Sequence, residues 1–140
     1  MADQQKKSQT RPPAQKFAEP SSGYLHPYAC FKCRKSFKRA AQPSPVLPCP
    51  ECGGPSIGLT RKFKPPKRSD IRQWGKVEAL VRHGFLFCSL PEPYPTDRNE
   101  VEAFAKRHAH FLQRERERFP EAYAEIEAAL SIHDQQKLKR

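Results

Sequence analysis

Residues 30–33 are CFKC and residues 49–54 are CPECGG, and these two stretches decide the fold of the chain. Each contains two cysteines separated by two residues, and fifteen residues lie between the two pairs. This spacing is typical of a zinc site with four thiolate ligands, because each pair closes a tight turn and a hairpin between the pairs brings the turns together. We therefore predict that one structural zinc ion is bound by Cys30, Cys33, Cys49 and Cys52.

The residue after each cysteine pair shapes its turn. Gly53 follows the second pair, and glycine permits the positive φ that lets backbone amides point toward a sulfur atom. Arg34 stands in the same place after the first pair. The first turn therefore departs from the commonest pattern, although the predicted metal site does not depend on it.

The two cysteine turns resemble those of the zinc-ribbon group, in which rubredoxin-like knuckles lie at the tips of β-hairpins. The resemblance covers roughly residues 24–63 and implies short antiparallel strands around a structural zinc. It is specific for metal and much less so for function, since such ribbons occur in ribosomal proteins, transcription factors, polymerase subunits and protein-interaction modules. Iron, as in a rubredoxin-like electron carrier, is the alternative metal.

The sequence around the cysteines predicts the strands of this ribbon. Residues 36–39 follow the first turn as a short strand, and residues 46–47 lead back to the second pair. Residues 57–63 alternate apolar and polar side chains, the pattern of a further strand. We expect Phe37 and Phe63 to form a small core over the metal, with Phe31 in the first turn more exposed.

Helical patterns follow the ribbon. Asp70 has Gln73 three residues later, which is typical of a helix start, and Gly84 is the expected stop. Trp74 lies between them and is expected to pack this helix onto the ribbon. After a proline-rich stretch at residues 90–95, apolar periodicity predicts two more helices, over residues 97–119 and from Pro120 onward, that pair as an antiparallel hairpin.

These observations predict a small α+β protein. Its expected parts are a disordered basic arm (residues 1–22), the zinc ribbon (23–64), a basic linker with a helix packed on the ribbon (65–89), and a proline linker with the helical hairpin (90–140). The apolar stripe of the hairpin is thin, so it needs the Trp74 helix, a second chain or a partner to cover it.

The positive charge is concentrated in the first part of the chain. Residues 1–87 contain 17 Lys and Arg against 5 Asp and Glu, a net charge of +12, whereas residues 88–140 have a net charge of −1. Such asymmetry favours a polyanionic partner, most commonly nucleic acid. Aromatic residues among the cations are typical of proteins that bind RNA or single-stranded DNA. The predicted nucleic-acid-binding residues are Lys32, Arg34, Lys35, Lys38, Arg39, Arg61, Lys62, Lys64, Lys67 and Arg68.

No catalytic constellation is visible in the sequence, and we predict a non-enzyme. The fifth cysteine, Cys88, has no evident base beside it and is expected to be a buried apolar residue. Our first hypothesis is a zinc ribbon that binds RNA or a ribonucleoprotein such as the ribosome. The first alternative is an adapter with a structural zinc, associated with transcription or translation, whose ribbon and C-terminal helices bind a protein partner. The second, less favoured, is a rubredoxin-like redox or metal-transfer protein.

The expected compartment follows from the same sequence. No apolar run is long enough to span a bilayer, and the first residues lack the apolar stretch of a signal peptide. We therefore expect a cytoplasmic protein without a membrane or small-molecule ligand. In that compartment thiols stay reduced, which favours metal ligands over disulfides.

Overall fold

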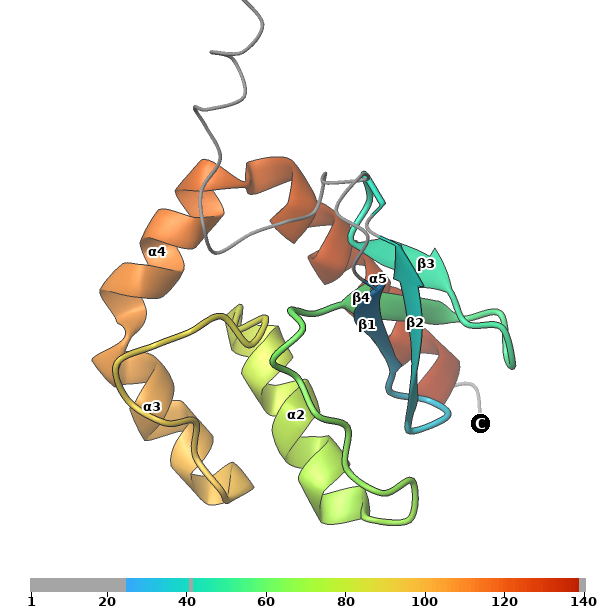
Figure 1. Ribbon diagram of the computed structural model, residues 1–140, viewed down its shortest axis with the longest axis horizontal. Coiled ribbons are helices and arrows are strands. Elements are labelled where there is room, and N and C mark those ends of the chain that lie inside the picture. Colours follow the sequence, from blue (N-terminus) through green and yellow to red (C-terminus); the bar gives the residue numbers. More distant parts are fainter. Residues whose placement is uncertain (1–24, 41, 139–140) are drawn as a thin grey trace, which may run out of the picture.

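The computed structural model describes residues 25–40 and 42–138. In this part of the chain a four-stranded antiparallel sheet comes first and helices follow it, which confirms the predicted small α+β fold (Figure 1). The predicted N-terminal arm lies outside the described residues. The strands are β1 (Leu25–Cys30), β2 (Lys35–Ala40), β3 (Val46–Pro48) and β4 (Pro55–Gly58). The helical elements are α2 (Ile71–His83), the short 3-10 helix η1 (Arg98–Glu100), α3 (Val101–Arg107), α4 (Ala109–Arg118) and α5 (Pro120–Leu138).

The sheet has the order β2-β1-β4-β3, so β2 is an edge strand. β1 pairs with β2 from Leu25 opposite Ala40 to Cys30 opposite Lys35. Its other side pairs with β4, where Ala29 lies opposite Ile57. Because all neighbours are antiparallel, the turn between β1 and β2 and the turn between β3 and β4 lie at the same end of the sheet.

The last strand differs from the predicted one. β4 spans Pro55–Gly58, whereas alternation predicted a strand over residues 57–63. The chain leaves the sheet at Thr60, whose backbone N–H donates to the carbonyl of Leu86 at 3.0 Å. Phe63 is nevertheless buried. The alternating pattern therefore identified side chains that are buried, but Phe63 is buried from an irregular segment and not from a strand.

Helix α2 begins and ends where the sequence predicts. The side chain of Asp70 accepts a hydrogen bond from the backbone N–H of Gln73 at 3.2 Å, which satisfies one of the unpaired amides of the first turn. Gly84 ends the helix with φ of 110°, a left-handed conformation that glycine adopts without a Cβ penalty. Trp74 is buried, and its indole N–H donates to the carbonyl of Lys67.

One apolar core joins the ribbon (residues 25–64) to α2 and α5. In Figure 1, α5 passes behind the sheet. The apolar stripe of α5, which the sequence left without a definite cover, is therefore buried inside the chain. The core consists of Ala29, Phe31, Ile57, Leu59, Phe63, Trp74, Val77, Val81, Leu86, Tyr123, Ile126 and Leu130.

The helix predicted over residues 97–119 is divided in two. α3 ends and α4 begins at His108, whose φ of −112° and ψ of 24° are not helical. The ring of His108 lies 2.8 Å from the carboxylate of Glu92 in the proline-rich stretch. The bend lets Phe104 before it and Leu112 after it both pack around Phe85 in a second apolar cluster. Among the described helices, none is long and apolar enough to span a membrane.

Candidate metal centre

The two cysteine turns have the same backbone geometry. In the first, the N–H of Arg34 donates to the carbonyl of Cys30 at 2.8 Å. In the second, the N–H of Gly53 donates to the carbonyl of Cys49 at 2.8 Å. Both donors have positive φ, 56° for Arg34 and 76° for Gly53. The first turn thus adopts the conformation that favours glycine although it carries an arginine, which is unfavourable for a residue with a Cβ.

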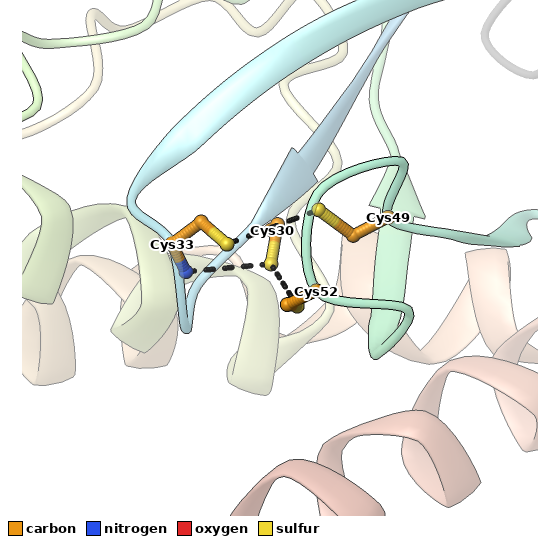
Figure 2. Close-up of side chains that lie close together, drawn as sticks. All are labelled: Cys30, Cys33, Cys49 and Cys52. Carbon is orange, nitrogen blue, oxygen red and sulfur yellow. Dashed lines mark hydrogen bonds between the residues drawn. The ribbon is translucent and has the colours of Figure 1, made fainter.

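The four sulfur atoms converge closely enough to bind a single metal ion (Figure 2). All four lie within 4.8 Å of one another. The Sγ atoms of Cys30 and Cys52 are 3.7 Å apart, and those of Cys33 and Cys49 are 3.9 Å apart. Four sulfurs at about 2.3 Å from a tetrahedral zinc would be about 3.8 Å from one another. A disulfide needs an S–S distance of about 2.05 Å, so these cysteines are thiols placed to bind a metal ion.

Backbone amides point at three of the sulfurs. Cys33 N–H donates to the sulfur of Cys30 at 3.4 Å, Glu51 N–H to that of Cys49 at 3.3 Å, and Gly54 N–H to that of Cys52 at 3.3 Å. Such donors stabilise negative sulfur, the form that binds metal.

The same environment sets the acidity of the thiols. Burial raises the pKa of Cys30 to about 11 and also raises the pKa of Cys33. Burial acts on Cys49 too, but the backbone N–H groups of Cys52 and Glu51 outweigh it and lower the pKa of that thiol to about 7. A metal ion must therefore displace protons from several of these thiols when it binds.

The donor set fits a structural zinc. Four thiolates complete the tetrahedral coordination that zinc prefers and leave no position for a substrate. The described residues contain no other group of three or more His, Cys, Asp or Glu side chains close enough to bind one ion. Cys88 is buried, as predicted, and does not belong to the cluster.

Cationic side chains lie around the cysteine cluster and hold the first cysteine turn through ion pairs and hydrogen bonds. Glu51 forms ion pairs with Lys35 at 3.2 Å and with Arg68 at 3.6 Å, and the cation of Lys35 lowers the pKa of this carboxyl group. The guanidinium of Arg68 also donates to the carbonyl of Cys33 at 2.9 Å, while that of Arg34 donates to the carbonyl of Arg68 at 3.3 Å. Because a zinc ion with four thiolates has a net charge of −2, these cations offset its charge.

The predicted nucleic-acid-binding residues lie in two stretches that the hydrogen bond between Arg34 and Arg68 joins. The first comprises the first cysteine turn with β2, and the second comprises residues 61–68. Two of the ten side chains, Arg34 and Lys35, are half-buried at the metal centre. The exposed ones are Lys32, Lys38, Arg39, Arg61, Lys62, Lys64, Lys67 and Arg68.

The aromatic residues of the ribbon correct two expectations and confirm a third. Phe31, expected to be exposed, is buried and lies edge-on to Trp74 with ring centroids 6.3 Å apart. Phe37, expected in the core, is only half-buried, because β2 is an edge strand and this side chain projects from the face away from the core. Phe63 is buried against Trp74, as expected.

Two features of the ribbon on which the proposals below depend were not found from the sequence. One is Glu51, whose contacts with both basic stretches depend on the fold. The other is the pairing of Phe37 with Tyr28, which the register of β1 and β2 determines. The alternation of side chains in residues 35–39 places Phe37 and Arg39 on the same face of the strand, so the contact between these two residues could have been predicted.

Comparisons of the chain with protein-family models, with curated proteins and with solved structures give no match.

Proposed function

We propose that this chain is a non-enzymatic protein that binds nucleic acid, with RNA or a ribonucleoprotein such as the ribosome as the favoured partner. In this proposal one zinc ion at Cys30, Cys33, Cys49 and Cys52 is structural. It holds the β1–β2 hairpin and the segment 61–68 in a rigid arrangement, and the cations of those segments contact phosphates.

The observation that carries the proposal is the one-sided charge of the ribbon surface. Between residues 25 and 69 the sequence has ten Lys and Arg and a single acidic residue, Glu51. That acid is already paired with Lys35 and Arg68. An excess of exposed cations attracts a polyanion, which releases its counterions when its phosphates are neutralised.

The helical part of the chain has a different electrostatic character. Its cations are largely engaged by acids, as in the pairs Arg107–Glu92 at 2.7 Å and Arg82–Asp134 at 2.6 Å. Helix α2 contributes Trp74 and Val77 to the core and also contacts η1 and α3, so its exposed side chains are confined to its ends, at residues 71–72 and 82–83. It therefore has no free face with which to enter a DNA major groove as a recognition helix would. This favours binding through the ribbon and argues against sequence-specific recognition of duplex DNA.

The test measures binding of a fluorescein-labelled RNA to the zinc-loaded protein by anisotropy, as salt is raised from about 50 to 200 mM. We expect Lys64→Gln/Lys67→Gln to weaken binding and to reduce the slope of log K against log salt by about 0.7 for each phosphate that is no longer neutralised. The matched control, Lys106→Gln/Arg114→Gln, removes the same charge from exposed positions on α3 and α4 and should change binding much less. Absence of salt-dependent binding to RNA and DNA at low salt would overturn the proposal, and equal effects of the two variants would overturn the ribbon as the site.

The adapter hypothesis loses one of its reasons. It relied on the thin apolar stripe of the C-terminal helices, and in the structure Tyr123, Ile126 and Leu130 are buried within the chain. Affinity capture from lysate with and without nuclease separates the two functions. Partners that disappear after nuclease treatment support nucleic-acid binding, and partners that remain support the adapter.

A further inference from the structure

An aromatic and cationic row crosses the face of the sheet that is turned away from α5. Tyr28 and Phe37 lie opposite each other on β1 and β2, with their rings stacked at a centroid distance of 5.7 Å and an interplanar angle of 17°. The guanidinium of Arg39, two residues after Phe37 on the same face, lies 4.9 Å from the centroid of the Phe37 ring. We call Tyr28, Phe37 and Arg39 the stacking row.

The register explains why this row is not part of the core. Ala29 lies opposite Ile57, and both belong to the apolar core with α5. Side chains alternate between faces along a strand, so Tyr28 projects to the opposite face. In Figure 1, α5 lies behind the sheet and β2 lies in front.

One end of the stacking row, at Tyr28, is buried, and the other end, at Arg39, is exposed. Tyr28 is only 3% exposed, and its ring lies over Gly58, where an added Cβ would come within 3.0 Å of the ring. Phe37 is half-buried and Arg39 is exposed. The buried tyrosine therefore fixes the orientation of the Phe37 ring, while the outer end of the row faces solvent.

We infer that the stacking row binds an unpaired base, so that the ligand of the ribbon is a single-stranded nucleic acid. This inference rests on the proposed function. The base stacks either on the guanidinium plane of Arg39 or directly on the Phe37 ring, where it displaces the guanidinium. Proteins use both kinds of surface to stack RNA bases. Lys38 projects from the opposite face of β2, and Lys32 is exposed in the turn of the same hairpin, so these two cations attract the phosphates of the strand without belonging to the row. Bases inside a duplex are already stacked and paired, so a duplex offers the row nothing to bind except phosphates.

Charge complementarity favours this ligand over a peptide. The row lies within the segment that has ten cations and one acid, and the row itself contributes a cation. A stack of this kind is also tolerant of sequence, because every base has a π-face. We therefore expect little dependence on which base is offered.

The experiment compares Phe37→Leu and Arg39→Lys with the unchanged protein, all zinc-loaded. The probes are fluorescein-labelled RNA of about 12 nucleotides, DNA of the same sequence and the corresponding blunt duplex. Phe37→Leu keeps an apolar side chain but removes the ring, and Arg39→Lys keeps the charge but removes the plane. The control is Leu25→Ala, which removes apolar surface from a 55% exposed position on β1. Zinc content and Trp74 fluorescence report that each variant is folded.

We expect Phe37→Leu to weaken single-strand binding about tenfold, within the range for loss of one base stack, and to leave the salt slope and duplex binding unchanged. Arg39→Lys should weaken single-strand binding by a smaller factor, and Leu25→Ala should have no effect. An equal loss of RNA and single-stranded DNA binding in Phe37→Leu supports the stack, since base stacking does not depend on the 2′-hydroxyl. If the protein binds single strands and duplex alike and Phe37→Leu changes neither, the stacking inference is overturned while the proposed function stands. If no probe binds, both are overturned.

Discussion

Replacing Gly53 by alanine tests whether the conformation of the cysteine turns stabilises the metal centre. Gly53 has φ of 76°, and a Cβ built there would have no atom within 4 Å. The substitution therefore creates no clash, and its cost comes from the backbone alone. An L-residue in the left-handed region costs about 1–2 kcal/mol. Alanine offsets roughly 0.4–1 kcal/mol of this by restricting the unfolded chain. The expected net destabilisation is about 1 kcal/mol.

The assay for Gly53→Ala is competition for zinc with a chromophoric chelator. In small zinc modules the free energy of metal binding is coupled to folding, so a destabilisation of about 1 kcal/mol should weaken zinc binding about fivefold. Gly54→Ala is the matched control at the neighbouring position. Its Cβ would lie 3.4 Å from the sulfur of Cys52 and 3.5 Å from Oε1 of Gln136, which are ordinary packing distances, and its φ lies outside the left-handed region.

The two variants separate backbone conformation from crowding. We expect Gly54→Ala, at the more crowded position, to change the zinc affinity less than Gly53→Ala, at the open one. If Gly54→Ala weakens zinc binding as much as Gly53→Ala or more, crowding dominates and the argument from φ fails.

Three further predictions concern the same centre. Arg34→Gly should strengthen zinc binding slightly, by about 0.5 kcal/mol. Glycine removes the backbone strain at φ of 56°, and this gain exceeds the loss of the exposed hydrogen bond from Arg34 to Arg68. Weaker zinc binding in the chelator assay would contradict this prediction. Trp74→Ala should destabilise the fold by about 3–5 kcal/mol, since it removes a buried ring from the interface between ribbon and α2, and an unchanged midpoint in denaturant unfolding would refute that packing role. Zinc affinity should fall as pH falls, because protons compete with the metal for the thiolates. The fall should be steeper below pH 7, where Cys49, with its pKa of about 7, also takes up a proton. A chelator titration that shows no pH dependence would exclude thiolate ligands.

Local sequence signals predicted the metal centre and the limits of helix α2. The spacing within each cysteine pair, the pair Asp70–Gln73 and the stop at Gly84 each depend on residues within one turn. The structure shows each of them in its predicted form. Such features can be predicted because the physical cause and its consequence lie a few residues apart.

Features that depend on distant segments could not be predicted in the same way. Phe37 is only half-buried because β2 lies at the edge of the sheet, and Phe31 is buried because Trp74 packs against it. The break at His108 involves Glu92, sixteen residues earlier in the chain. The strand after the second cysteine pair ends early because Thr60 bonds to Leu86. In each case a tertiary contact overrode a local pattern that was itself correctly identified.

The most direct test of the account is the identity and coordination of the metal in protein purified without added metal. Elemental analysis with X-ray absorption at the metal edge measures both. We predict one zinc per chain with four sulfur neighbours at about 2.3 Å, and loss of the metal together with the fold in Cys49→Ser. A visible iron chromophore, nitrogen or oxygen ligands in the first coordination sphere, or a Cys49→Ser variant that stays folded without metal would contradict it.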